Sequence, residues 1–411
     1  MSHSKMLEVV TPVYLEHFSC LGQACPDDCC HGLDVTVDHD IYSRLQGLPD
    51  RELKPVIMHA LHRGQGKSGS ASYGYLSRQQ DERGNCEFLS AERLCRLQQK
   101  CGEQMLPDVC SAFPRVTKMA GNQAEQYATL ACPEIVRLLL ASEDALQLQL
   151  RPVSVRAGTI VQEAPAMASP AARQVREFFL TLLATVELPA WQSLAVMLLL
   201  AEALQPLFGE HGADEAQVAR LLADWEQQLL DGRLLSELDA LRRHDLLHVK
   251  VMAAASRVRA NIDFRSQRYL QLIEEALHGF ATDCADAAAL AHGFAAIDGM
   301  AAMDATLRRV LFNHAAMRYF PSVGNLLADV EMLCIEYLSL RFWLAGLAQA
   351  RGGNLPQEAA AELIYLFYRV NIHVPSYLLQ CYQAFQQAGM TKVEHWLLLL
   401  PLLGGQEQLP D

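Results

Sequence analysis

The chain has 411 residues, 51% of them hydrophobic and 20% charged, which is enough to bury a large core in two or more packing units. Its net charge of −13 argues against a nucleic-acid partner, because a phosphate backbone attracts basic surfaces. The sequence opens without a secretory signal, and its longest apolar runs are too short to span a bilayer. We therefore expect a cytoplasmic protein with no membrane span.

The first 150 residues predict a small, cysteine-rich domain that contains short strands. The segment FSCLGQACPDDCCHGLDVTVD (18–38) contains Cys20, Cys25, Cys29 and Cys30, and the alternation in its last six residues predicts a strand. Residues 63–75 are rich in glycine and serine and predict a loop. Five more cysteines follow: Cys86, Cys95, Cys101, Cys110 and Cys132.

From residue 133 the pattern becomes helical. PEIVRLLLASEDALQLQL (133–150) predicts a helix opened by Pro133, and residues 151–170 predict a polar linker. Apolar positions then recur at helical spacing in further segments: 171–186, 191–208, 214–230, 234–260, 305–320, 323–350 and 356–370. We predict a mainly α protein, with a cysteine-rich metal- or cluster-binding domain at 1–150 and a larger all-helical domain at 151–411.

Nine cysteines in the first third of the chain indicate metal binding, because a reducing compartment disfavours disulfides. Thiolates are soft ligands that suit zinc or an iron–sulfur centre, and the spacing decides neither between these metals nor between one site and two. The alternative is a set of unrelated core thiols. Cys284, Cys334 and Cys381 each lie alone in an apolar helical pattern and are expected to be ordinary buried thiols.

Several segments resemble a known family. FSCLGQACPDDCCHGLDVTVD, CEFL…LCRLQ…LPDVCSAFPRV and ACPE resemble the YkgJ-type cysteine-cluster proteins, and more closely the flagellin lysine-N-methylase (FliB) family. RRVLFNHAAMRYFP (308–321) and YRVNIHVPSYLL (368–379) are similar to the C-terminal half of that family. The resemblance covers nearly the whole chain and implies a cysteine-rich N-terminal part followed by a long helical part.

The resemblance implies an enzyme, a protein-lysine N-methyltransferase that modifies surface lysines of flagellin. It would use S-adenosylmethionine and a cysteine-bound iron–sulfur cluster, [4Fe–4S], with zinc as the alternative metal. Carried over position by position, the implied metal ligands are Cys20, Cys25, Cys29, Cys30, Cys86, Cys95, Cys110 and Cys132. The family pattern has no cysteine at Cys101. Which four cysteines bind one cluster stays open. Our first choice is Cys20, Cys25, Cys29 and Cys30, and the expected correction is that Cys110 or another later thiol replaces Cys29 or Cys30.

Arg115 is the predicted cofactor-binding residue. It lies between two cysteines of the array, and a guanidinium can bind the donor's carboxylate through two parallel hydrogen bonds. The alternative is a buried structural arginine. The sequence has neither a glycine-rich Rossmann motif nor the C-x₃-C-x₂-C spacing of radical enzymes, so radical and direct methyl transfer both stay open. The alternative function is a non-catalytic zinc- or iron-binding cysteine-cluster protein.

Methyl transfer requires the neutral form of the lysine amine. From a reference pKa near 10.4, deprotonation at pH 7 costs about 4–5 kcal/mol. Tyrosines and histidines of the C-terminal half are candidates to assist it, although core packing explains each of them as well. These candidates are Tyr319, Tyr337, Tyr365, Tyr368, Tyr377, Tyr382, His314 and His373. We assign no catalytic residue from the sequence.

Overall fold

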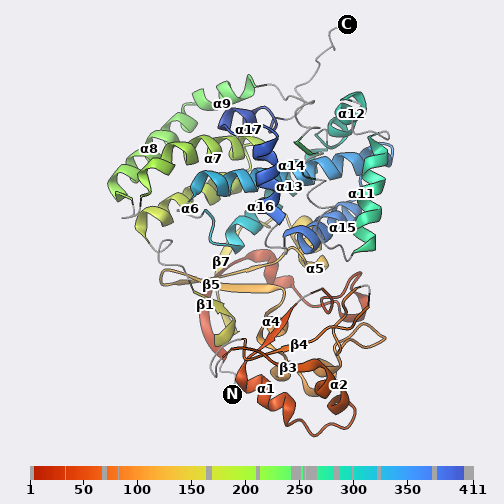
Figure 1. The fold of residues 1–411 in the computed structure, drawn as a ribbon. Helices are drawn as coiled ribbons and strands as arrows, with labels where there is room; N and C mark the ends of the chain where they lie inside the picture. The colour runs from red at the N-terminus through yellow and green to blue at the C-terminus, as the bar shows by residue number, and fades with distance from the viewer. Residues whose placement is uncertain are drawn as a thin grey trace. The chain divides into compact units, whose positions relative to one another are not determined.

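The computed structural model of the chain forms two compact units, Met1–Gln162 and Glu163–Asp411, and each is described by itself (Figure 1). The structure describes residues 4–32, 34–66, 72–81, 83–162, 169–209, 213–241, 251–252, 255, 266–280, 287–298, 300–321, 325–372 and 377–401.

A five-stranded sheet runs through the N-terminal unit in the order β7-β1-β6-β5-β8. Its strands are β1 (Ser4–Pro12), β5 (Arg115–Ala120), β6 (Gln123–Ala128), β7 (Leu148–Arg156) and β8 (Ile160–Val161). β1 pairs with β6 in parallel and with β7 antiparallel, so that Ser4 lies opposite Arg156 and Pro12 opposite Leu148. β1 and β7 each have nine residues and are longer than the short strands that the sequence predicts.

Strand β7 also changes the expected course of the chain around residue 150. The predicted helix 133–150 is helical only as α5 (Pro133–Ala141), and the strand then continues past residue 150 into the segment expected to be a linker. In LQLRPVSVR the alternation is limited to two pairs, Leu148 with Leu150 and Val153 with Val155, and pairing with the antiparallel partner β1 over the full length holds the segment as a strand.

A second, three-stranded sheet has the order β2-β4-β3. It consists of β2 (Val35–Val37), β3 (Leu61–Arg63) and β4 (Gly74–Leu76), and β2 confirms the strand predicted within 33–38. Short helices complete the unit: η1 (Val13–His17), η2 (Gly22–Ala24), α1 (His39–Gln46), α2 (Leu53–Ala60), α3 (Arg96–Cys101), η3 (Glu103–Met105), α4 (Asp108–Ala112) and η4 (Ala157–Thr159).

The small sheet and helices α1 to α3 share an apolar core with some of the cysteines. The buried side chains include Val37, Ile41, Leu45, Phe88 and Leu97. Cys86, Cys95 and Cys101 pack against this core while staying partly exposed. The apolar core therefore fixes the backbone from which the second cysteine group projects.

The C-terminal unit is helical throughout the described residues, and the predicted fold class, mainly α, is confirmed. Its helices are α6 (Pro170–Ala184), α7 (Ala190–Leu204), η6 (Gln205–Leu207), α8 (Glu215–Leu230), α9 (Arg233–Asp239), α11 (Gln267–Gly279), α12 (Ala287–Asp298), α13 (Ala301–Met317), α14 (Leu326–Ala350), α15 (Gln357–Phe367), the π-helix η7 (Tyr368–Ile372), α16 (Tyr377–Gln387) and α17 (Val393–Leu397). Most of the predicted helix 234–260 beyond α9 lies outside the described residues.

Helix α14 is the central helix of this unit. It is apolar on nearly all sides, and neighbours that include α7, α11, α12 and α13 surround it. Helix α11 approaches it so closely that a Cβ added to Gly279 would lie 2.1 Å from the carbonyl oxygen of Gly346. Glycine at both positions is therefore a packing requirement. Cys334 on α14 and Cys381 on α16 are fully buried, as predicted, and Cys284 lies outside the described residues.

The segment Ala190–Leu207 is long and apolar enough to cross a membrane by length and composition. However, 67% of it is buried inside the structure. That degree of burial is typical of a core helix in a globular fold.

Candidate functional site

Five of the predicted cysteines line one cavity of the N-terminal unit, with a volume of about 80 Å³: Cys29, Cys30, Cys86, Cys95 and Cys110. They come from backbone segments that are far apart in the sequence, including the loop after η2, the start of α3 and helix α4. The remaining walls are largely apolar. We call this space the sulfur cavity. It brings the two cysteine groups of the sequence together.

Neighbouring thiols in the sulfur cavity disfavour one another's ionisation. A hydrogen bond with Cys29, together with burial, holds the pKa of the Cys30 thiol well above its usual range. Burial raises the pKa of Cys86 to about 11, and Cys95 and Cys29 add to this shift. Burial also raises the pKa of Cys110, with Cys86 and Cys95 contributing. Several thiolates this close together need a cation, which is what a metal centre provides.

The other three predicted ligands form a neighbouring group that shares Cys29. Burial raises the pKa of Cys25, and Cys20 and Cys29 contribute to the increase. Burial raises the pKa of Cys132 to about 12, with Cys25 and Cys29 as further causes. The group Cys20, Cys25, Cys29 and Cys30 is thus divided, because its last two members line the sulfur cavity with later thiols.

Solvent reaches the sulfur cavity. Cys29 and Cys110 are exposed as whole residues, although the Cys110 thiol itself is enclosed, and Cys30, Cys86 and Cys95 are partly exposed. Cys101, which lies at the end of α3, packs against the apolar core and is absent from the described lining of the cavity. An entry path and a convergent donor set are both needed for a metal site, and the sulfur cavity has them.

A larger, polar cavity of about 880 Å³ lies in the same unit. Arg115 lines it, and Thr117 and Gln126 form part of the sheet face below, where the Gln126 amide donates to the Thr117 hydroxyl over 2.9 Å. Arg44, Asp40, Glu103 and Arg156 also line it. We call this space the polar cavity.

Arg115 is an exposed residue, which contradicts the alternative of a buried structural arginine. Its guanidinium carbon lies 5.6 Å from the centre of the Phe18 ring, and it has no hydrogen bond or ion pair within the described part of the chain. Arg156, by contrast, donates to the carbonyl oxygen of Leu106 over 2.8 Å and lies 3.4 Å from Asp108. Arg44 lies 3.8 Å from Asp40. Among these three arginines, Arg115 is therefore the one without a carboxylate partner in the described part of the chain.

Helix α4 is a common wall of the two cavities. Val109 and Cys110 line the sulfur cavity, while Ser111 and Ala112 line the polar cavity. The two cavities are therefore separated by one short helix.

In the C-terminal unit the structure joins the two segments that resemble the FliB family. Nδ1 of His314, on α13, lies 2.7 Å from Oε2 of Glu336, and the hydroxyl of Tyr368, in η7, donates to the same oxygen over 2.9 Å. All three side chains are buried. Sequence reasoning missed Glu336. The available signal was a carboxylate within a helix that is apolar on all sides.

Glu336 is held in its ionised form. Burial opposes ionisation, but the imidazole of His314 outweighs it with help from Arg318 and Tyr368, so the pKa of Glu336 falls below its ordinary value. An imidazole oriented by a carboxylate is the arrangement of a general base, but here it is enclosed in the protein core.

The remaining tyrosine and histidine candidates are dispersed. Tyr337, Tyr365 and Tyr377 are buried in the helical core, and Tyr319 and Tyr382 are partly exposed. His373 lies outside the described residues.

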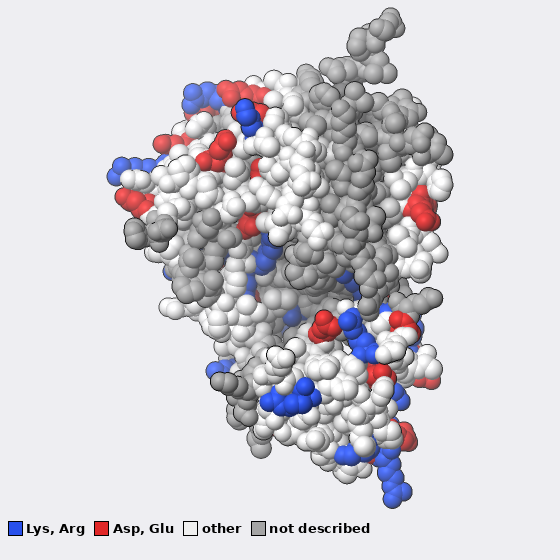
Figure 2. All heavy atoms as spheres, in the orientation of Figure 1, with Lys and Arg blue, Asp and Glu red and all other residues white. Residues whose placement is uncertain are grey.

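On the face drawn in Figure 2, lysine and arginine side chains are interspersed with acidic ones over the described surface.

Comparison with known proteins gives a family. The profile of the FliB lysine N-methylase C-terminal domain matches residues 176–399, more than half of the chain. Lysine-N-methylase of Salmonella choleraesuis (strain SC-B67) is 32% identical over 144 residues, which is 35% of this chain and 35% of that protein. Lysine-N-methylase of Salmonella typhimurium is 31% identical over 144 residues, which again cover 35% of this chain and 35% of that protein.

A third relative is shorter. The flagellar biosynthetic protein FliU of Salmonella muenchen is 32% identical over 152 residues, 35% of this chain and 83% of that protein. The chain thus spans about a third of the length of the lysine-N-methylases that it matches. No solved structure matches it significantly.

Proposed function

This chain belongs to the FliB lysine N-methylase family, and we propose that it is an S-adenosylmethionine-dependent protein-lysine N-methyltransferase acting on flagellin in the cytoplasm. The names of its relatives, lysine-N-methylase and a flagellar biosynthetic protein, support the reaction and the substrate. The structural observation that carries the proposal is the convergence of cysteines from distant segments on the sulfur cavity.

The sulfur cavity fits a metal centre. Five thiols line it, and four thiolates are enough to hold an iron–sulfur cluster or, as the alternative, a zinc ion. A bound iron–sulfur cluster would supply an electron or a free iron coordination position. Cys29, Cys30, Cys86, Cys95 and Cys110 would hold it, and Cys20, Cys25 and Cys132 would complete or extend the ligand set.

The polar cavity is the proposed donor site. The carboxylate of S-adenosylmethionine would bind Arg115, since this guanidinium has no carboxylate partner among the described residues. Asp40 and Glu103 on the same walls suit the donor's ammonium and sulfonium charges, and Thr117 and Gln126 offer hydrogen bonds to its hydroxyl groups.

Methyl transfer forms a C–N bond to lysine and breaks the C–S bond of the donor, and the lysine nitrogen loses one proton. A pocket that removes water from the ammonium lowers its pKa and favours the reactive neutral amine.

The test is methyl transfer by protein purified without oxygen. We expect iron and sulfide in the purified chain, broad absorbance near ~400 nm typical of such clusters, and labelled methyl groups on flagellin lysines after incubation with labelled S-adenosylmethionine. If zinc-loaded protein still methylates flagellin, the methyltransferase function stands and the bound metal is zinc in place of an iron–sulfur cluster. A metal-loaded protein that transfers no methyl group under reducing conditions would support the non-catalytic alternative.

A further inference from the structure

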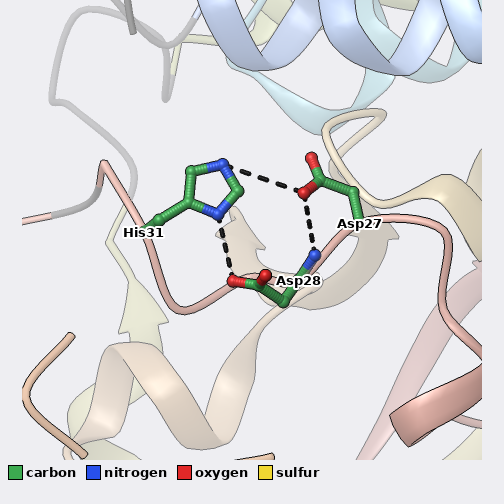
Figure 3. A group of neighbouring side chains, drawn as sticks. All are labelled: Asp27, Asp28 and His31. Carbon is green, nitrogen blue, oxygen red and sulfur yellow. Dashed lines mark hydrogen bonds and ion pairs between the residues drawn. The ribbon is translucent and has the colours of Figure 1, made fainter. Parts of the chain in front are cut away.

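Asp27, Asp28 and His31 form a compact cluster directly beside the sulfur cavity. Their potential ligand atoms all lie within 4.8 Å of one another, and Figure 3 shows the imidazole ring facing both carboxylates. Asp28 and His31 are 8% and 9% exposed, so these polar groups need partners inside the protein. By geometry alone the cluster resembles a divalent-cation site.

A guanidinium occupies that position. Nη2 of Arg83 lies 3.0 Å from Oδ1 of Asp27, 3.2 Å from Oδ2 of Asp28 and 2.9 Å from Nδ1 of His31. A cation bound to the same atoms would have to displace this side chain. Arg83 thus supplies a positive charge to both carboxylates of the cluster.

Asp28 connects the backbone segments that carry four thiols of the sulfur cavity. Its Oδ1 accepts from the backbone N–H of Cys30 over 3.2 Å, which shapes the turn bearing Cys29 and Cys30. Its Oδ2 contacts Arg83, three residues before Cys86.

The third connection from Asp28 leads towards Cys95. Nε of Arg93, two residues before that cysteine, lies 3.6 Å from Oδ2 of Asp28. Arg93 has a φ of +62°, a left-handed conformation that is uncommon for a residue with a side chain. Such conformations persist where the surrounding structure determines them.

The backbone follows the same connections. The N–H of Cys86 donates to the carbonyl oxygen of Cys30 over 2.6 Å, and the N–H of Gly32 donates to that of Gly84 over 3.2 Å. Segments 30–32 and 84–86 are thus paired antiparallel, with the Asp28–Arg83 contact at the side of the pair.

We propose that Asp28 is a positioning residue for the sulfur cavity, acting through Arg83 and Arg93 to hold Cys29, Cys30, Cys86 and Cys95 in binding geometry before metal arrives. The need for such a residue follows from the site. The thiols project from loops and short helices, and burial of several thiolates at one place is unfavourable until the metal binds. Side chains that orient metal ligands without touching the metal typically change its affinity by ~10–100-fold when removed.

This inference rests on the proposed metal centre but is tested without methyl transfer, so the two can fail separately. The probe is Zn²⁺ alone, titrated into the full-length apo-protein under reducing, oxygen-free conditions against a competing chelator. The variants are Asp28→Asn, Arg83→Gln and the double variant. Arg83 is 43% exposed, and far-ultraviolet circular dichroism of each variant before the titration checks that it keeps the wild-type fold. Asp34→Asn is the matched control: Asp34 pairs at 3.0 Å with Arg78, which also lines the sulfur cavity, but Asp34 is 89% exposed, so the loss of this pair costs little.

We expect Asp28→Asn and Arg83→Gln each to weaken zinc binding by ~10–100-fold, the double variant to lose less than the product of the two, and Asp34→Asn to bind like the wild type. Wild-type affinity in Asp28→Asn would overturn the proposal. So would the loss of one zinc equivalent from Asp28→Asn with the thiol-bound zinc unchanged in affinity, because Asp27, Asp28 and His31 would then be metal ligands themselves.

Discussion

Glu331 and Glu336 lie on the same helix, α14, and both are buried, yet their environments shift their pKa values in opposite directions. The pKa of Glu336 is lowered because His314, Arg318 and Tyr368 outweigh burial. The pKa of Glu331 is raised because burial outweighs its hydrogen bond with Tyr382. We therefore predict that Glu336→Gln destabilises the C-terminal unit strongly at pH 7, and that Glu331→Gln is neutral or stabilising there.

The magnitude for Glu336→Gln follows from its contacts. The ionised oxygen takes part in two contacts, from His314 and Tyr368, and each loses roughly 1 kcal/mol when its acceptor becomes a neutral amide. Oε1 has no hydrogen-bond partner among the described residues, so the new amide N–H₂ group would be buried there unsatisfied, costing about 1–3 kcal/mol more. The sum of about 3–5 kcal/mol lowers the thermal midpoint by roughly 10 °C for a unit of this size.

The assay is thermal unfolding followed by far-ultraviolet circular dichroism between pH 3 and pH 7. A carboxylate whose pKa is lower in the folded state contributes stability above its unfolded pKa, near ~4.3, and that stability is lost as the pH falls through the folded pKa. The difference between the wild type and Glu336→Gln should therefore shrink in acid. Equal losses for both variants at pH 7, or a difference that does not change with pH, would refute this electrostatic account.

Three further predictions concern the two cavities and the helix packing. Cys110→Ser should lose most of its bound metal, measured by elemental analysis, while Cys101→Ser keeps it; the reverse result would reassign the ligands. Arg115→Ala should weaken S-adenosylmethionine binding by ~10–100-fold in calorimetry, since a charged hydrogen bond contributes about 1.5–3 kcal/mol, and unchanged binding would move the donor elsewhere. Gly346→Ala should lower the unfolding free energy by about 1–3 kcal/mol or more through overpacking. Gly209 has open space around it, so Gly209→Ala is the control and should leave the stability unchanged. Equal thermal midpoints for the two variants would contradict the close approach of α11 and α14.

The periodic features of the fold were predictable from the sequence. The helical spacing in 171–186 and 323–350 anticipated α6 and α14, and the alternation within 33–38 anticipated β2. The cysteine groups were visible as composition, because thiols are rare and their crowding has few physical causes.

Long-range pairings were not predictable. β1 and β7 pair across more than a hundred residues, and nothing local in LQLRPVSVR separates a strand from the end of a preceding helix. The same limit applies to the site. The crowding of Cys20, Cys25, Cys29 and Cys30 in the sequence made them the first choice of ligands, but backbone pairing with the segment around Cys86 places Cys29 and Cys30 among later thiols.

The position of α4 has a thermodynamic consequence. One short helix presents Cys110 to one cavity and Ser111 to the other, so any displacement that improves the fit of one occupant alters the space of the second. Energetic linkage of this kind is reciprocal: the factor by which a bound metal changes the affinity for the donor equals the factor by which the bound donor changes the affinity for the metal. With positive coupling, protein stripped of metal would bind the proposed methyl donor more weakly than metal-loaded protein, and donor-free protein would lose metal to a chelator more readily.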